Sequence, residues 1–160
     1  MDGLIIPEFV WVTSAVGYWT NPEVANALAE RKAGIDGFRI ARVARVKDNP
    51  FQIIDKDEFY ERARTLQQVS MYGEISYPLK DETLNSDIVA LSTDQWGAIY
   101  YSVYPGEKRD ISYSQRRIVS EYEDNHEEPC PSLDVRYETG TRTDRDCCVL
   151  VAALIIGEVA

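Results

Sequence analysis

The stretch EYEDNHEEPC, residues 121–130, places five carboxylates around the single histidine of the chain, His126, and ends in Cys130. Three kinds of chemistry could use such groups. They are proton transfer by the imidazole, metal binding by thiolate, imidazole or carboxylate, and electrostatic contact with a basic partner. The other motifs of the chain, its charge and its expected elements favour one of the three.

The common enzyme motifs are missing from the sequence. There is no Gly-x-x-x-x-Gly-Lys loop for phosphate, no Gly-x-Gly-x-x-Gly for dinucleotides, no Gly-x-Ser-x-Gly elbow and no His-Glu-x-x-His zinc pair. A nucleophile with a histidine base would have to use His126, the sole imidazole. We therefore expect no catalytic residues and favour a protein that is not an enzyme.

A zinc site built from His126, Cys130, Cys147 and Cys148 does not fit the usual spacing. Structural zinc sites normally present paired knuckles, and adjacent residues of a strand point to opposite faces. The carboxylates also lack the glycine turn and terminal glutamate of an EF-hand. We expect no metal and no cofactor. Three cysteines favour reduced thiols, while a disulfide between Cys130 and Cys147 stays open.

Charge favours the third kind of chemistry. Seventeen Lys and Arg face 27 Asp and Glu, a formal net charge of −10, which attracts basic partners and opposes direct contact with nucleic acid. The acidic stretch is expected to be a loop, either a contact surface or simply solvated charge. The carboxylates expected to contact the partner are Glu121, Glu123, Asp124, Glu127 and Glu128.

Aromatic residues supply a second candidate surface. The chain has ten tyrosines and three tryptophans, and Trp96, Tyr100 and Tyr104 would lie along one face of a strand, with Ile99, Tyr101 and Val103 on the other. Large rings with a polar tip are favoured at interfaces, so the first three could anchor a partner. The alternative is that this face packs beneath helices.

A basic strip interrupts the acidic chain at residues 39–47. Such cations could contact phosphate, but no aromatic residues alternate with them as they do in single-strand binding grooves. Pairing with the acids of the same chain is the favoured interpretation, with Arg42 as the candidate for an internal pair. The strip consists of Arg39, Arg42, Arg45 and Lys47.

Two helices are expected in the first part of the chain. Asn21 is a good N-cap, Pro22 suits the first helical position, and Gly34 can end the first helix. The shared face of this helix is expected to carry Val24, Ala27, Leu28 and Arg31. Asp55 caps a second helix, whose apolar stripe is Phe59, Ala63 and Leu66.

Most of the remaining chain follows the period of two that is typical of strands. Residues 4–19 and 37–50 are expected to be strands, residues 51–55 a partner strand, and residues 96–120 a hairpin turning at Pro105-Gly106. The second limb, 110–120, could instead be helical. A last pair of strands is expected around Thr139-Gly140, and it ends in the apolar run 147–157.

These patterns predict an α+β fold in a single domain, residues 1–160. An antiparallel sheet of five to six strands would occupy the C-terminal two thirds, with two helices from the N-terminal third packed on one face. The apolar run 147–157 is too short to cross a membrane, and the opening residues lack the basic region of a secretory signal, so we expect a cytoplasmic protein.

The function favoured by the sequence is that of a non-catalytic acidic binding or inhibitor protein, of the immunity or antidefence type. It would block a basic protein partner such as a nuclease toxin or a nucleic-acid-binding effector. One alternative is a small hydrolase that depends on carboxylates, with or without a divalent metal. Another is a viral or assembly component whose apolar C-terminal strand offers an interface edge. A homodimer is compatible with each.

Overall fold

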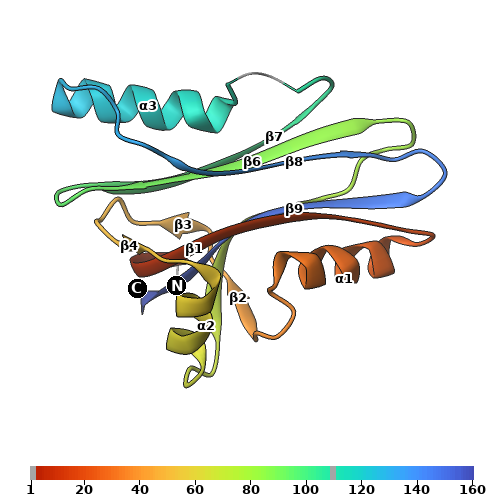
Figure 1. The fold of residues 1–160 in the computed structure, drawn as a ribbon, viewed down its shortest axis with the longest axis horizontal. Coiled ribbons are helices and arrows are strands. Elements are labelled where there is room, and N and C mark those ends of the chain that lie inside the picture. Colours follow the sequence, from red (N-terminus) through yellow and green to blue (C-terminus); the bar gives the residue numbers. More distant parts are fainter. Residues whose placement is uncertain (1–2, 109–110) are drawn as a thin grey trace.

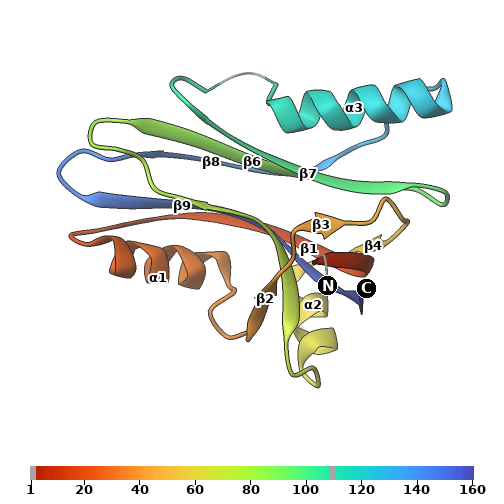
Figure 2. The same cartoon turned by 180° about the vertical axis from the view of Figure 1, so that it is seen from behind.

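A computed structural model describes residues 3–108 and 111–160, and it stacks four layers (Figures 1 and 2). Helix α3 covers a three-stranded sheet B, sheet B packs on a six-stranded sheet A, and helices α1 and α2 cover the other face of sheet A. The helices are α1 (Pro22–Ala33), α2 (Lys56–Ala63) and α3 (Tyr113–His126). Sheet A contains β1 (Leu4–Trp19), β2 (Ile40–Arg42), β3 (Arg45–Val46), β4 (Gln52–Ile53), β5 (Val69–Ser76) and β9 (Asp146–Val159). Sheet B contains β6 (Thr83–Ser92), β7 (Gly97–Pro105) and β8 (Asp134–Thr141).

The α+β class is confirmed, but the expected single antiparallel sheet is only roughly right. The strands divide into two sheets, and sheet A is mixed because β2, β3 and β4 pair in parallel with their neighbours. Sheet A also includes β1, from the part of the chain that was expected to supply helices. The two N-terminal helices do share one face of sheet A, as expected.

Sheet A curls where residues 40–46, which contain β2 and β3, pair with two separate strands. The expected strand at residues 37–50 is broken: β2 pairs with β5, whereas β3, only three residues later, pairs with β1. The break lies at Val43 and Ala44, which donate backbone hydrogen bonds to Met71 and Gly3 respectively. The expected partner strand becomes β4, which pairs with β1.

Helix α1 begins and ends where the sequence predicts. The Asn21 side chain accepts a hydrogen bond from the backbone N–H of Val24 at 2.9 Å, and Gly34 closes the helix at φ 81°. The expected buried face is wrong, because Ala25, Ala29 and Ala33 face β1 instead. Gly17 explains the difference: without a Cβ it lets the helix backbone at Ala25 come into direct contact with the strand, so only small side chains fit between them.

Helix α2 is shorter than expected but keeps its cap. Asp55 accepts a hydrogen bond from the backbone N–H of Glu58 at 2.9 Å, and Phe59 and Ala63 are buried. Leu66 lies beyond the end of the helix and is 43% exposed, so it does not extend the apolar stripe.

Helix α3 confirms the helical alternative for much of residues 110–120, in place of the second limb of a hairpin, and it also takes up much of the expected acidic loop. Position 110, where that limb would begin, lies outside the described residues. Ser112 and Gln115 form a capping box, and Ser114, Ile118 and Tyr122 are buried one turn apart along one face. The hairpin partner of β7 is β6, and the turn joining β8 to β9 lies after Thr141 rather than at Thr139-Gly140.

Strand β9 forms the middle of sheet A, between β1 and β5. The apolar run is therefore a buried strand, and an edge for assembly has to be sought elsewhere in the molecule. In the part of the chain that the structure describes, no helix is long and apolar enough to cross a membrane.

Candidate binding site at the end of helix α3

The acidic stretch 121–130 begins inside α3 and continues past its end, and its five carboxylates have different surroundings. Glu121 accepts hydrogen bonds from the Tyr100 hydroxyl and, at 3.3 Å, from Nε of Arg117. Glu123 accepts one from the backbone N–H of Cys130 at 3.1 Å. Three others are exposed and are the carboxylates best placed to meet a partner: Asp124, Glu127 and Glu128.

His126 is held in an aromatic stack rather than beside a nucleophile. Its ring lies 4.1 Å from that of Tyr122, nearly parallel, and the Trp96 ring is 5.9 Å away. Nδ1 of His126 is 2.9 Å from the carbonyl oxygen of Tyr122. The Tyr122 hydroxyl donates to Glu128, just beyond the helix. These contacts fix the conformation of the last turn of α3 and of the carboxylate that follows it.

The hydrogen bond from Tyr122 to Glu128 should make the stability of the protein depend on pH. Hydrogen bonding to Glu128, together with burial, raises the pKa of Tyr122 from 10.0 to about 12. The stability from this raised pKa is complete below pH 10 and is lost as the pH rises through 12. We expect the free energy of unfolding to fall less steeply in a Tyr122→Phe variant than in the wild type over this range, as measured by urea unfolding at a series of pH values. Parallel curves would contradict the assignment.

The aromatic residues expected as anchors do share one face, with Trp96 just before β7 and Tyr100 and Tyr104 within it, and that face packs beneath α3. Tyr104 is only 5% exposed, and Tyr100 and Trp96 are half-buried against the helix. The guanidinium of Arg117 lies 4.0 Å from the Tyr100 ring centroid. Burial and the bond to Glu121 raise the pKa of Tyr100 well above its usual value. These rings hold α3 on sheet B, and Trp96 is the one that borders His126.

A cleft of about 660 Å³ opens beside the end of α3. Its apolar wall is made by Phe9, Phe51 and neighbouring prolines, and its carboxylates are Glu8, Asp94 and Glu158. Glu8 occupies a β-bulge, because the register of β1 against β9 shifts between Pro7 and Phe9. The complete lining is Ile6, Pro7, Glu8, Phe9, Asn49, Pro50, Phe51, Gln52, Thr93, Asp94 and Glu158.

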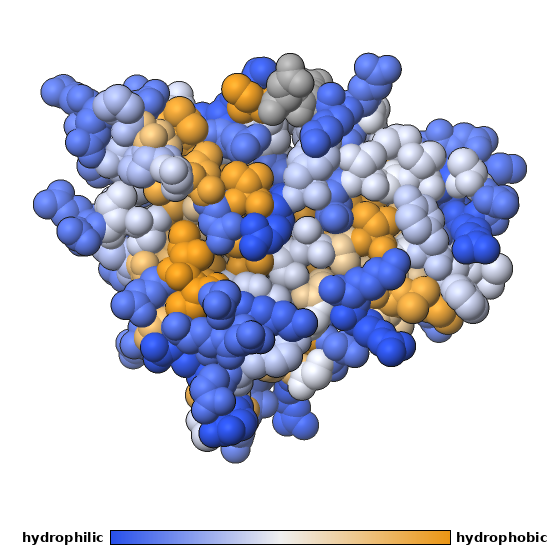
Figure 3. Space-filling view, in the orientation of Figure 1, coloured by the Kyte–Doolittle hydropathy of each residue, from blue (hydrophilic) through white to orange (hydrophobic). Residues whose placement is uncertain are grey.

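A smaller pocket of about 270 Å³ lies between the β6–β7 turn and the end of α3. It is lined by Thr93, Asp94, Gln95, Tyr122, His126 and Glu128, so the two hollows share the turn between β6 and β7. Figure 1 shows this turn, the C-terminal end of α3, β4 and both chain ends at one end of the molecule. On the face in Figure 3, apolar surface extends from α3 down to β3, framed by hydrophilic residues.

We call Glu8, Asp94, Glu128 and Glu158 the acidic tract, because they line these two hollows, which share Thr93 and Asp94. Neither lysine nor arginine is among the described residues that line them. Sequence reasoning found only Glu128. The other three are single acids separated by long intervals, and no local pattern distinguishes them.

The basic strip remains at the surface. Arg39, Arg42, Arg45 and Lys47 are all exposed. Arg42 donates a hydrogen bond to the backbone carbonyl of Gly73 in β5 at 3.2 Å, so the expected pairing with an acidic side chain is replaced by one with the backbone. The strip runs through the short strands β2 and β3 and lines neither hollow of the acidic tract.

The three cysteines are free thiols. Cys130 packs between α3 and sheet B, whereas Cys147 lies against Tyr18 and Gly140 on the opposite side of sheet B, so the disulfide left open above does not form. Cys148 faces the other side of β9, as adjacent strand residues must. Across residues 3–108 and 111–160, no group of three or more His, Cys, Asp or Glu side chains is arranged to hold a metal ion.

No model of a known protein family matches the chain, and no curated protein matches it. The geometry of the site is therefore the basis on which a function is proposed.

Proposed function

We propose that this protein is a non-catalytic acidic binding protein that blocks a basic protein partner, in the manner of an immunity or antidefence inhibitor. The contact surface would combine the exposed carboxylates at the end of α3 with the acidic tract. A partner of this kind would be a nuclease toxin or an effector that binds nucleic acid, because such proteins present clustered lysines and arginines.

One observation carries the proposal: carboxylates from β1, β9, the β6–β7 turn and the end of α3 line two hollows that share this turn, with no basic residue among their described lining. The net charge of −10 adds a long-range field of the same sign. Charged groups arranged in this way steer an oppositely charged protein toward the site and raise its association rate. The aromatic stack at Trp96, Tyr122 and His126 gives this charged surface a rigid support.

The test uses a charge-removing variant of the exposed carboxylates, Asp124→Asn with Glu127→Gln and Glu128→Gln. It leaves Glu121 and Glu123 in place, because these two hold Tyr100 and Cys130, and the amide oxygen of Glu128→Gln can still accept the hydrogen bond from the Tyr122 hydroxyl. The wild type should retain a basic protein from source-cell lysate at low salt and release it at high salt. The association rate constant of that protein should fall about tenfold in the variant at low ionic strength, with little difference at high salt.

A matched control removes the same number of charges from residues that line neither hollow. Glu23→Gln, Asp57→Asn and Glu107→Gln all change exposed residues outside the acidic tract. We expect this control to bind nearly as fast as the wild type. If it slows association as much as the α3 variant does, net charge alone governs binding, and the proposed surface is wrong. Absence of any salt-sensitive basic partner would overturn the function itself.

The cleft also favours a second candidate function, a carboxylate-dependent hydrolase. Paired carboxylates can divide the acid and base roles of glycoside hydrolysis when their surroundings differ. Against this, Glu8, Asp94 and Glu158 are all exposed, so none has the apolar enclosure that usually prepares a carboxylic acid for proton donation. Release of product from a panel of glycosides, abolished by Glu8→Gln or Asp94→Asn, would favour the hydrolase over the binding protein.

A further inference from the structure

We propose that a second copy of this chain pairs with the free edge of strand β7, so that the two copies of sheet B join across a two-fold axis. This inference goes beyond the proposed function, because it concerns a different surface and a different partner. The apolar strand β9 cannot supply such an edge, since it lies in the middle of sheet A. Strand β7 can, because the order of sheet B is β7-β6-β8.

The register of β7 against β6 shows which of its backbone groups point outward. The backbone N–H of Gly106 donates to the carbonyl of Thr83, so these two form a hydrogen-bonded pair. Since such pairs alternate along antiparallel strands, the N–H and C=O groups of Tyr101 and Val103 point away from β6. Within the described chain, no other hydrogen bond uses the backbone of either residue. Each copy therefore offers two free donors and two free acceptors in a row.

The accessible part of this edge is residues 101–105. The carbonyl oxygen of Asn49 lies against Gly97, so the chain between β3 and β4 shields the first residues of β7. Exposure then rises along the strand, and Val103 is 36% exposed. An apolar side chain at such a position becomes buried when another strand pairs beside it.

The edges of sheet A carry features that oppose pairing with another chain. Strands β2, β3 and β4 are only two or three residues long. Beyond β2, the carbonyl of Gly73 in β5 accepts a hydrogen bond from Arg42, and Glu74 follows with a charge. Short strands and charged side chains are the usual protection of a sheet edge.

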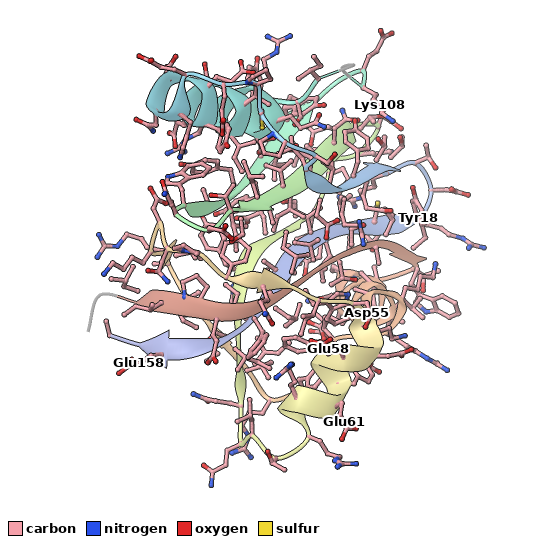
Figure 4. The ribbon with its side chains drawn as sticks, turned by 60° about the vertical axis from the view of Figure 1, so that its left-hand side comes forward. Tyr18, Asp55, Glu58, Glu61, Lys108 and Glu158 are labelled. Carbon is pink, nitrogen blue, oxygen red and sulfur yellow. The ribbon has the colours of Figure 1, made fainter. Side chains whose placement is uncertain are left out.

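The two edges of sheet B differ in the same respect. Strand β8 carries a charge at every second residue from Asp134 to Glu138, and the backbone N–H of Thr141 donates to the hydroxyl of Tyr18 at 3.3 Å. Figure 4 shows Tyr18 beside β8. In contrast, residues 97–104 contain no charge and no proline, and they pair with β6 without a bulge. Among the strand edges described, β7 is the one without these protections.

A neutral edge suits a second copy better than a basic partner. A basic protein would be attracted by carboxylates, and residues 97–105 have none. Two chains with a net charge of −10 repel each other, so contact between them is most favourable where acids are absent. The second copy also brings a strand that is already extended, so little conformational freedom is lost when the two strands pair.

Helix α3 fits the same two-fold axis. It contacts both β6 and β7, so two antiparallel β7 strands about 4.8 Å apart would set the two α3 helices about 10 Å apart, which is a normal packing distance for helices. The face of α3 above β7 carries Tyr113, Arg117, Glu121 and Asp124 at helical spacing. Because the two helices run antiparallel, Arg117 of each copy faces the acidic half of the other, and the charges are complementary.

Sedimentation velocity from about 1 µM to 1 mM tests the proposal, and we expect a reversible dimer of the wild type. Val103→Pro removes an outward N–H from both copies but no bond to β6, so the dissociation constant of the dimer should rise at least about tenfold. Val135→Pro is the matched control, since the N–H of Val135 points outward from β8 and the dimer should persist. A wild type that stays monomeric throughout would overturn the inference.

A second variant and a second measurement keep the test decisive if Val103→Pro fails to fold. Val103→Lys brings two ammonium groups together at the pairing edges and should weaken the dimer in the same way. Hydrogen exchange in the wild-type dimer should be slower at the amides of Tyr101 and Val103 than in this variant at position 101, with no change at Val135 or Tyr137. A dimer that survives both Val103 variants, or protection on β8 instead, would show that β7 is not the interface.

Discussion

Replacing Asp87 by alanine should lower the free energy of unfolding by about 3 to 4 kcal/mol. The Asp87 side chain is fully buried in β6 and accepts hydrogen bonds from the hydroxyls of Ser102 on β7 and Ser112 at the start of α3. Its loss leaves both hydroxyls without this acceptor, and each buried polar group left unsatisfied costs about 1 to 3 kcal/mol. The free energy of unfolding of a typical domain is only about 5 to 15 kcal/mol, so this loss is large.

Urea unfolding measures the Asp87 effect, and two serines of α3 supply matched variants. Ser112→Ala removes one donor to Asp87 and the N-cap of the helix, so it should cost about 1 to 3 kcal/mol. Ser114→Ala lies two residues away and is also buried, but its Oγ has no hydrogen-bond partner among the described residues. That change should be neutral or slightly stabilising. Equal costs for the two serine variants would contradict the role given to Asp87.

Loss of the Asp87 hydrogen bonds should also loosen α3 from sheet B. The capping box at Ser112 aligns the helix start, while Tyr100 and Arg117 hold its middle to β7. In an Asp87→Ala protein that still folds, hydrogen exchange should rise first in α3. Since this helix carries Asp124, binding of a basic partner should weaken in parallel, even though Asp87 itself is far from the solvent.

The second large effect is expected at Gly17, where β1 meets α1. A Cβ at this position would clash with the carbonyl oxygen of Ala25 and lie 2.7 Å from the backbone nitrogen of Ala29. Backbone atoms cannot turn aside as a flexible side chain can, so the whole helix would have to move away from the sheet. We expect Gly17→Ala to cost about 2 to 3 kcal/mol, measured as a shift in the urea midpoint.

Gly37 provides the control for the Gly17 prediction. A Cβ there would meet no atom within 4 Å, and its φ lies outside the left-handed region. Gly37→Ala should therefore be neutral, or stabilising by up to about 1 kcal/mol, because alanine restricts the unfolded chain. If both alanine variants unfold at the same urea midpoint, then close packing of α1 does not require glycine at position 17.

Local signals predicted much of the secondary structure. Asn21, Pro22 and Gly34 mark α1, and Asp55 marks the start of α2, because helix ends depend on the few residues around them. The alternation of Trp96, Tyr100 and Tyr104 along β7 was also readable, since a strand's two faces follow from its period. Helix α3 carried the signal Ser112-x-x-Gln115, but apolar residues spaced by two competed with it.

Features that depend on contacts between distant residues were not predictable. Alternation shows that a strand has two faces but not which sheet it joins, so the division into sheets A and B was missed. The face of α1 depends on Gly17, which says nothing about helices by itself. The carboxylates of the cleft lie on β1, β9 and a turn, and only the packing of these elements brings Glu8, Asp94 and Glu158 together.

The placement of β9 has a consequence for how the chain reaches its native state. Its residues pair with β1 on one side and β5 on the other, and Ala160 donates a backbone hydrogen bond to Leu4. During synthesis, β1 leaves the ribosome more than a hundred residues before β9, its long antiparallel partner. The edge of β1 that pairs with β9 therefore stays unpaired until the end of synthesis, and we expect the chain to fold slowly and to gain from a chaperone that covers this edge meanwhile.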